Sequence, residues 1–388
     1  MTTFQKVKLK DICVSVDYGF TASSSKINIG PKFLRITDIV PPTINWSDVP
    51  YCKIPDKEKD KYLLSEGDIV IARTGATTGY GKYIKNPPIS IFASYLVRFK
   101  INKENNSRYA GHIIESKDYK DFITNNLGGS AQPQANAQVL GSYELFLPDL
   151  LTQNNIASIL TTYNELIENN EKRIKTLEEM AQLLYTEWFV KLKFPGHEKV
   201  KKDDSKSSYG MIPRGWEVKK LSDIIQIKKG KNITKNTVVD GDVPVVAGGT
   251  DPAYYHNVSN TISPVITISA SGAGAGFVKL YYKDIWASDC SYIDKNITEY
   301  VYFFYLFLKN KQKEISNLQR GSAQPHVYPK DLMTLKIIYS LDIISKFNTL
   351  VTPLFELVNK LNEKNSNLTK TRDLLIPQLV TGKRQLKN

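Results

Sequence analysis

The sequence predicts an α+β chain in which two similar globular domains are separated by two long helices that form an antiparallel coiled coil. Three observations support this fold class. Landmarks of the first half recur in the second half, each half ends in a long helical stretch, and a polar segment rich in Pro, Gly and Ser joins the halves. Two such copies in one chain predict a pseudo-two-fold internal repeat.

The length of 388 residues exceeds what one hydrophobic core usually organises. The predicted order is a first globular domain at 1–150, a central long helix at 151–192, a linker at 193–211, a second globular domain at 212–340, and a C-terminal long helix with its tail at 341–388.

The two globular domains are predicted to share one fold plan with loops of different length. Their common landmarks, in the same order, are an apolar strand with a glycine turn (69–75 and 266–272), an aromatic-Ala-Ser triplet (92–94 and 286–288), and an identical Gly-Ser-Ala-Gln-Pro (129–133 and 321–325). The charged segment at 55–59 is interpreted as a loop.

The two long helices show the alternating three- and four-residue spacing of a coiled-coil seam. The seam positions are Leu160, Tyr163, Ile167, Asn170, Ile174, Leu177, Ala181, Leu184 and Trp188 in the first helix, and Val351, Leu354, Val358, Leu361, Asn365, Leu368, Arg372, Leu375 and Leu379 in the second.

Antiparallel pairing with Asn170 opposite Asn365 brings the apolar positions of both seams together, for example Leu160 with Leu375. Facing Asn residues cost stability but fix the register, because a slipped alignment buries each amide without a partner. The alternative is that each helix packs separately on its own domain. Pro377 is expected to stop or kink the second helix.

Charge indicates a polyanionic partner. The chain has 52 Lys plus Arg against 39 Asp plus Glu, a net charge of +13 and a pI near 9.3, which favours nucleic acid through phosphate neutralisation. A membrane surface also attracts basic proteins, but the sequence contains no apolar run of about 18 residues and no N-terminal signal pattern. We therefore predict a cytoplasmic protein without a membrane partner.

Cysteine and histidine usage argues against a metal centre. Cys13, Cys52 and Cys290 are scattered without CxxC spacing, and the four histidines are equally dispersed. We expect no catalytic, cofactor-binding or metal site in this chain.

Several segments together resemble one family. The segment 212–221 (Ile-Pro-Arg-Gly-Trp-Glu-Val-Lys-Lys-Leu), the strand and turn at 67–75, the helix start at 153–160 and the helix end at 372–382 resemble the specificity subunit of type I restriction-modification systems. The resemblance spans nearly the whole chain. One departure is that the first globular domain begins without the Ile-Pro-x-Gly-Trp segment.

The resemblance implies a non-catalytic subunit that reads an asymmetric, bipartite target on double-stranded DNA. It also implies partner chains that perform the chemistry. These are two modification subunits with N6-adenine methyltransferase activity and S-adenosylmethionine, and restriction or translocase subunits that use ATP and Mg. The outward faces of the paired helices are the expected docking surface. A seam of about 29 residues spans roughly 43 Å, close to the roughly 34 to 36 Å between half-sites of two-fold DNA readers.

Base reading requires polar side chains on loops that reach a groove edge, with cations on phosphates. The candidates for DNA contact are Arg73, Thr74, Thr77, Thr78, Lys82 and Ser94 in the first domain, and Lys229, Lys231, Ser269, Ser271, Lys279 and Ser288 in the second. Gln132 and Gln324 occur in both copies, so we interpret their motif as a structural hinge or phosphate contact rather than a reader of sequence.

Two other functions are kept as alternatives. The first is a scaffold that binds proteins rather than DNA. The second is a DNA adenine methyltransferase, suggested by Asn-Pro-Pro-Ile at 86–89 and by the glycine run at 272–276. The first motif lacks the aromatic residue that stacks on an extruded adenine, and the glycine run leads into a strand-like segment rather than a helix.

Overall fold

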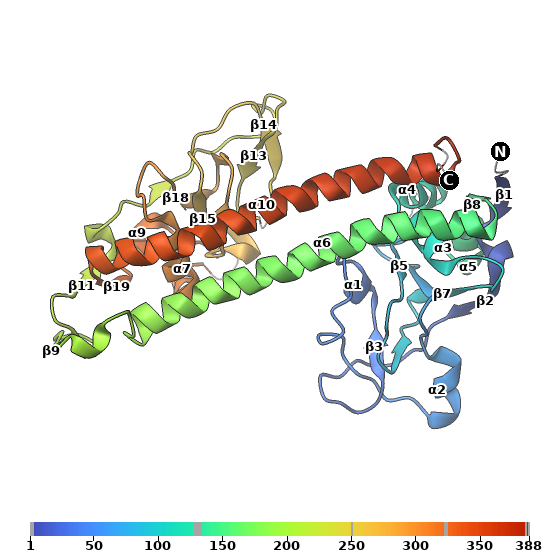
Figure 1. The fold of residues 1–388 in the computed structure, drawn as a ribbon, viewed down its shortest axis with the longest axis horizontal. Helices are drawn as coiled ribbons and strands as arrows, with labels where there is room; N and C mark the ends of the chain where they lie inside the picture. The colour runs from blue at the N-terminus through green and yellow to red at the C-terminus, as the bar shows by residue number, and fades with distance from the viewer. Residues whose placement is uncertain (1–3, 128–133, 250, 322–324, 385, 387–388) are drawn as a thin grey trace. The chain divides into compact units, whose positions relative to one another are not determined.

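The computed structural model describes residues 4–127, 134–249, 251–321, 325–384 and 386 (Figure 1). The chain divides into two compact units, of which unit one is Met1–Asn170 with Lys364–Asn388 and unit two is Glu171–Glu363. Each unit contains a globular part and a segment of both long helices, which are α6 (Leu150–Tyr185) and α10 (Leu341–Val380).

Unit one is built on an antiparallel sheet in the order β2 (Cys13–Tyr18), β7 (Leu96–Ile101), β4 (Ile69–Ala72) and β5 (Gly81–Tyr83). Two further pairs flank it, namely antiparallel β1 (Gln5–Lys8) with β8 (Glu144–Leu147), and parallel β3 (Lys32–Leu34) with β6 (Ser90–Phe92). Its short helices are α1 (Ile36–Ile39), α2 (Asp56–Tyr62), α3 (Ser107–Ile114), α4 (Lys117–Asn126) and α5 (Ala137–Gly141).

Unit two repeats this topology. Its main sheet has the order β12 (Lys228–Lys229), β18 (Cys290–Ile293), β15 (Val265–Ser269) and β16 (Val278–Tyr281). The other strands are β9 (Lys202–Asp204) with β10 (Met211–Pro213), β11 (Glu217–Lys220) with β19 (Lys336–Tyr339), and β14 (Tyr254–His256), β13 (Val243–Val246) and β17 (Trp286–Ala287). Its short helices are α7 (Val301–Asn310), α8 (Gln312–Asn317) and α9 (Pro329–Leu332).

The predicted internal repeat is confirmed down to single hydrogen bonds. In both units the glycine after the central strand has a positive φ, +88° at Gly79 and +82° at Gly276, where a side chain would be strained. The amide of each donates back to the last strand residue, Ala72 or Ser269, at 2.8 Å. A Cβ at either glycine would also approach an isoleucine of the following helix pair. The turn and the helix therefore pack in the same way in both units.

The core of unit one joins the sheet to both long helices. Buried side chains of β4 and β7 meet those of α3, and Leu160 of α6 and Leu379 of α10 complete the cluster. In unit two the corresponding cluster is rich in aromatic rings. Phe347 of α10 contacts Trp188 at a centroid distance of 5.4 Å and Phe189 at 5.1 Å. Burial of this apolar surface is what fixes each globular part to its helices.

The two long helices pair with each other in antiparallel directions in both units, as predicted (Figure 1). In unit one Asn170 Nδ2 donates to Asn365 Oδ1 at 2.8 Å, and Asn365 Nδ2 lies 3.4 Å from the carbonyl oxygen of Ile167. The expected register is therefore confirmed, and the alternative of two separately packed helices is wrong.

Pro377 was expected to stop or kink the second helix; it does not stop it, since α10 continues to Val380. Ile376 and Leu379 on either side of the proline are both buried in the core of unit one. Their burial holds the backbone helical although proline removes one helical hydrogen bond.

Two polar segments contain more structure than their composition suggests. The segment interpreted as a charged loop forms α2, and Tyr62 at its end packs against Phe20 at a centroid distance of 5.3 Å. The segment predicted as a linker contributes β9, and its Phe194 is buried and stacked on Trp216 at 5.0 Å. Packing of Tyr62 therefore helps to order the first segment, and packing of Phe194 helps to order the second.

Candidate nucleic-acid interface

In unit one, three chain segments meet at one end of the main sheet. Strands β2 and β4 end there at Tyr18 and Ala72, and β7 begins there at Leu96. The amide of Arg73 donates to the carbonyl of Tyr95 at 3.0 Å, and the carbonyl of Arg73 accepts from the amide of Ala135 at 2.9 Å. The turn after β4 is thus held on both sides by backbone hydrogen bonds.

Arg73 is the cation at this sheet end. Its guanidinium carbon lies 4.9 Å from the centroid of the Tyr18 ring, a cation–π contact. Its Nε is buried and has no hydrogen-bond partner among the residues that the structure describes. The Tyr18 hydroxyl accepts from the amide of Ala137 at 3.0 Å, which fixes the ring beneath the guanidinium. Tyr95 beside it is 60% exposed.

The other candidates of unit one divide between the turn and the edge strand. Thr78 is buried, and its hydroxyl donates to the carbonyl of Gly75 at 2.7 Å, which closes the turn. The carbonyl of Thr77 accepts from the amide of Tyr80 at 3.0 Å. Thr74 forms an isolated β-bridge with Gln134. The amide of Ser94 donates to the carbonyl of Phe20 at 2.8 Å. Lys82 on β5 donates to the carbonyl of Pro42 at 3.0 Å.

Unit two has the same sheet end with different side chains. The amide of Ala270 donates to the carbonyl of Asp289 at 3.3 Å, and the carbonyl of Ala270 accepts from the amide of Val327 at 3.0 Å. The hydroxyl of Ser271 donates to the carboxylate of Asp289. Unit two therefore has an alanine where unit one has Arg73, and the polar groups beside it are the hydroxyl of Ser271 and the carboxylate of Asp289.

The remaining candidates of unit two differ in exposure. Ser269 and Ser288 are buried; the hydroxyl of Ser269 donates to the carbonyl of Gly248 at 2.7 Å, and that of Ser288 accepts from the amide of Ile233 at 3.3 Å. Lys229 and Lys231 are exposed at the end of β12. Lys279 lies 3.9 Å from the carboxylate of Asp251 and occupies the edge-strand position that Lys82 has in unit one.

Sequence reasoning missed Tyr18, Tyr95 and Asp289. A signal existed, because Tyr95 and Asp289 each follow directly after the repeated Ala-Ser pair. Gln132 and Gln324 lie outside the described residues, although the residues directly after their repeated motif bridge to the sheet-end turn, Gln134 to Thr74 and His326 to Ser271.

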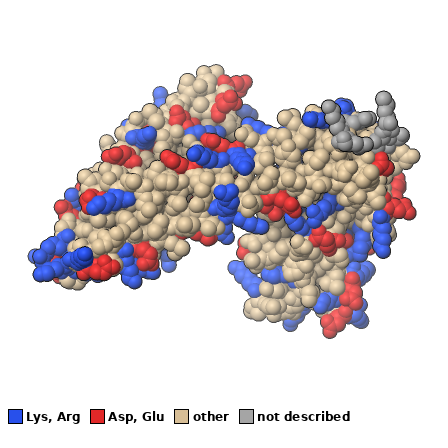
Figure 2. All heavy atoms as spheres, viewed as in Figure 1, with Lys and Arg blue, Asp and Glu red and all other residues tan. Residues whose placement is uncertain are grey.

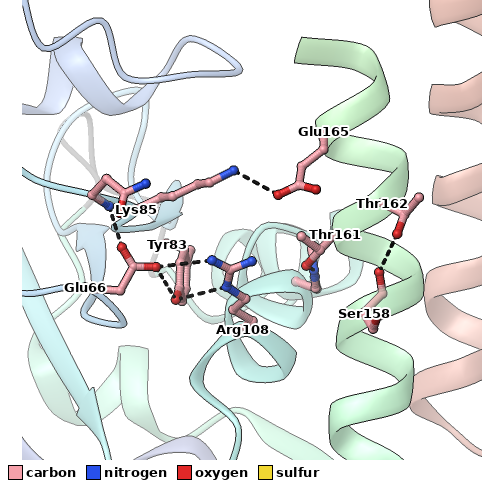
Figure 3. A network of polar contacts seen from close by, with 10 residues as sticks. Glu66, Tyr83, Lys85, Arg108, Ser158, Thr161, Thr162 and Glu165 are labelled. Atoms are coloured by element: carbon pink, nitrogen blue, oxygen red, sulfur yellow. Dashed lines mark hydrogen bonds and ion pairs between the residues drawn. The ribbon is translucent and has the colours of Figure 1, made fainter. Parts of the chain in front are cut away.

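A polar network seats the globular part of unit one on α6 (Figure 3). Glu66 accepts hydrogen bonds from Arg108 and from the Tyr83 hydroxyl, both at 3.2 Å, and Lys85 Nζ lies 3.1 Å from the Glu165 carboxylate on α6. Burial opposes ionisation of Glu66, but the hydrogen bonds from the amide of Asn86 and from Arg108 lower the pKa of its carboxyl. None of these residues carried a recognisable pattern in the sequence.

Charge is mixed over the face shown in Figure 2, where Lys and Arg side chains are interspersed with Asp and Glu. Within the described ranges, no group of three or more His, Cys, Asp and Glu is arranged to hold a metal ion. No helix in the described part of the chain is long and apolar enough to cross a membrane.

A duplicated module, with different side chains at one shared sheet end and paired long helices, defines a protein with two recognition units in one chain. The family model described as the type I restriction modification DNA specificity domain matches residues 1–179 and 213–345. The chain belongs to this family, and its function is that of a specificity subunit of a type I restriction-modification system.

Relatives span most of the chain. The type I restriction enzyme MjaIX specificity subunit of Methanocaldococcus jannaschii is 27% identical over 350 residues, covering 84% of this chain and 79% of that protein. The HindI specificity subunit of Haemophilus influenzae is 26% identical, covering 69% of this chain and 74% of that protein. The crystal structure of the S subunit from M. genitalium covers 100% of this chain and 97% of its own, with a TM-score of 0.60 and 16% identity, and so shares the fold.

Proposed function

We propose that the chain reads an asymmetric, bipartite target on double-stranded DNA, one half-site with each unit. The observation that carries this proposal is the shared sheet end, where the same backbone frame presents Arg73 in unit one and Ser271 with Asp289 in unit two. Identical frames with different polar side chains suit the reading of different base edges.

The burial of Thr78, Ser269 and Ser288 narrows the proposed set of DNA contacts. Each of these hydroxyls bonds to the protein backbone, so they act in shaping the loops. The proposed contacts are the remaining candidates, which are Arg73, Thr74, Thr77, Lys82 and Ser94 in unit one and Lys229, Lys231, Ser271 and Lys279 in unit two. Lysines among them suit phosphates, and the shorter side chains suit base edges.

The chemistry is proposed to reside in partner chains. Two methyltransferase subunits that bind S-adenosylmethionine, and restriction subunits that use ATP and Mg, would act on the DNA that this chain selects. Their proposed docking surface is the outward side of the long helices, where Leu151, Leu183 and Leu374 are 65% to 70% exposed. We place the complex in the cytoplasm because its substrate is DNA.

Modified-base sequencing of DNA from cells that make the whole complex tests the proposal. The expected result is one methylated motif with two unlike blocks and an unread spacer, absent when this chain is deleted. A motif that persists without this chain would overturn the proposal.

Binding measurements separate the proposal from its alternatives. Binding of the target duplex should weaken steeply with salt, by a log–log slope of about 0.9 per phosphate contacted. A protein-binding scaffold predicts no specific duplex binding. Saturable binding of S-adenosylmethionine to the isolated chain would instead support methyltransferase activity of its own.

A further inference from the structure

The hydrogen bonds at the sheet end place side chains of the two units at equivalent positions. Arg73 donates its amide to the carbonyl of Tyr95, and Ala270 donates its amide to the carbonyl of Asp289. Arg73 therefore corresponds to Ala270, and Tyr95 to Asp289. The carbonyls of Arg73 and Ala270 also accept equivalent hydrogen bonds, from the amides of Ala135 and Val327 respectively. The backbone frame is the same, so these side chains are one place where the two units can differ in base preference.

In unit one this position offers hydrogen-bond donors. A guanidinium has five N–H donors and no acceptor, and its fork matches the O6 and N7 acceptors of guanine in the major groove. The Tyr18 ring at 4.9 Å supports the plane of the Arg73 guanidinium. Arg73 Nε is buried without a hydrogen-bond partner among the described residues, so any base contact would be made by the terminal nitrogens of the guanidinium.

In unit two Ala270 replaces Arg73, and the neighbouring Asp289, equivalent to Tyr95, offers acceptors at the same sheet end. The Asp289 carboxylate accepts from the Ser271 hydroxyl, which orients it, and retains further acceptor capacity. A carboxylate close to DNA phosphates is repelled by their charge. A hydrogen bond from a donor on a base offsets this repulsion. In the major groove the donors are the amino groups of cytosine N4 and adenine N6.

The geometry points to opposite hydrogen-bonding polarity at this shared sheet end, carried by neighbouring positions of the common backbone frame: Arg73 donates to a guanine in the half-site of unit one, and Asp289 accepts from the amino group of a cytosine or an adenine in the half-site of unit two. This inference rests on the proposed function, because it requires a DNA target.

The test uses the full-length chain and randomised DNA duplexes. Selection with the wild-type chain first defines both half-sites, and single-base variants of the selected duplex then measure discrimination. Arg73→Ala should reduce discrimination at one guanine by about 5- to 150-fold. Asp289→Ala should reduce discrimination at one cytosine or adenine by a similar factor, and the base affected identifies which amino group is read.

Affinity for unrelated DNA is a second measurement, and removing Asp289 or Arg73 should change it in opposite directions. Removal of Asp289 deletes a negative charge, so non-specific binding should stay equal or tighten, whereas removal of Arg73 should weaken it. Arg73→Lys keeps the charge but loses the fork, so it should retain the salt slope and lose the guanine preference. Lys6→Ala is the matched control, since Lys6 lies in the β1·β8 pair and bonds to Glu144. It should leave all base preferences unchanged.

Each possible result bears on one part of the inference or on the proposed function. Equal weakening on all sequences by Arg73→Ala, with a smaller salt slope, would assign Arg73 to a phosphate and overturn its part of the inference. Unchanged base preferences in Asp289→Ala would overturn the other part; if that variant does not fold, Asp289→Asn keeps the shape, adds a donor and must alter the preference. A wild-type chain that selects no sequence contradicts the proposed function itself.

Discussion

Arg98 joins a buried charge cluster of unit one, and its loss should cost considerable stability. Its side chain is 8% exposed, donates to Asp17 at 2.8 Å and to the carbonyl of Leu63 at 2.7 Å, and lies 3.8 Å from the buried Asp68. Burial raises the pKa of Asp68, which the charge of Arg98 opposes. Arg98→Ala leaves both carboxylates without their cation and should lower the free energy of unfolding by about 3 to 5 kcal/mol.

Urea unfolding of Arg98→Ala and Lys6→Ala measures this effect against an exposed ion pair. Lys6 and Glu144 are both more than half exposed, so Lys6→Ala should cost less than about 1 kcal/mol. An equally small loss in Arg98→Ala would contradict a structural role for the buried cluster.

His112 should make the stability of unit one depend on pH. Burial lowers the pKa of its imidazole below 6.5; Glu115 opposes this, while Arg372 and Arg108 add to it. The folded chain therefore binds fewer protons here than the unfolded chain. Stability should fall as pH drops through 6.5 and level off below the folded pKa.

The variant His112→Gln isolates this contribution, because glutamine does not titrate and can still bond to Thr161, which lies 3.1 Å from His112 Nε2. The difference in unfolding free energy between wild type and variant, measured from pH 5 to 8, should shift in favour of wild type as pH rises. A difference that stays constant over this range would show that His112 does not couple to folding.

Candidate contact residues could be named only where the repeat marked them. Arg73 and Ser271 were candidates because they lie between a repeated strand and its glycine turn. Asp289 and Tyr95 lie one residue beyond a repeated pair, and their role appears only when backbone hydrogen bonds bring them beside the turn. Glu66, Arg108 and Glu165 come from segments distant in sequence, so no local pattern could have joined them.

At the scale of elements, the Asn170 and Asn365 pair should determine helix register. Asn170 is 3% exposed and its amide bonds to Asn365 at 2.8 Å. Asn170→Ala leaves a partly buried amide without this partner and should cost about 1 to 3 kcal/mol. The double variant Asn170→Leu with Asn365→Leu should recover or exceed wild-type stability, because an apolar seam favours helix pairing while relaxing its register.

Urea unfolding of Asn170→Leu, Asn365→Leu and the double variant Asn170→Leu with Asn365→Leu gives the coupling between the two residues. Asn367→Ala, at an exposed position of α10, is the control and should change stability by less than about 0.5 kcal/mol. Additive losses in the double variant would contradict a direct interaction between the amides.

The elements differ in how far sequence could predict them. The long helices follow from a regular apolar spacing over many turns, which is a local signal. The strands β12 and β17 have only two residues each, too few for any periodicity, and exist because they pair with distant strands. Pro377 does not stop α10 as one of its two expected effects would have it, since core packing on both sides outweighs a local preference.

At the scale of the whole molecule, the length of the helix pair should set the spacer between half-sites. Both α6 and α10 contribute to both units. One heptad inserted after Lys175 and another after Asn359 enter at facing positions of the register set by Asn170 and Asn365. The seam therefore stays in phase, and each helix lengthens by about 10 Å, close to the rise of three base pairs at about 3.4 Å each.

Methylation mapping of the doubly lengthened chain should show unchanged half-sites with a spacer about three base pairs longer, or no methylation if the added DNA twist cannot be accommodated. Insertion into only one helix is the control, since it shifts one seam against the other and should abolish methylation. This expectation follows from the proposal that the globular parts contact the bases and the helices set the spacing. An unchanged spacer in the doubly lengthened chain would show that the helices do not measure the DNA.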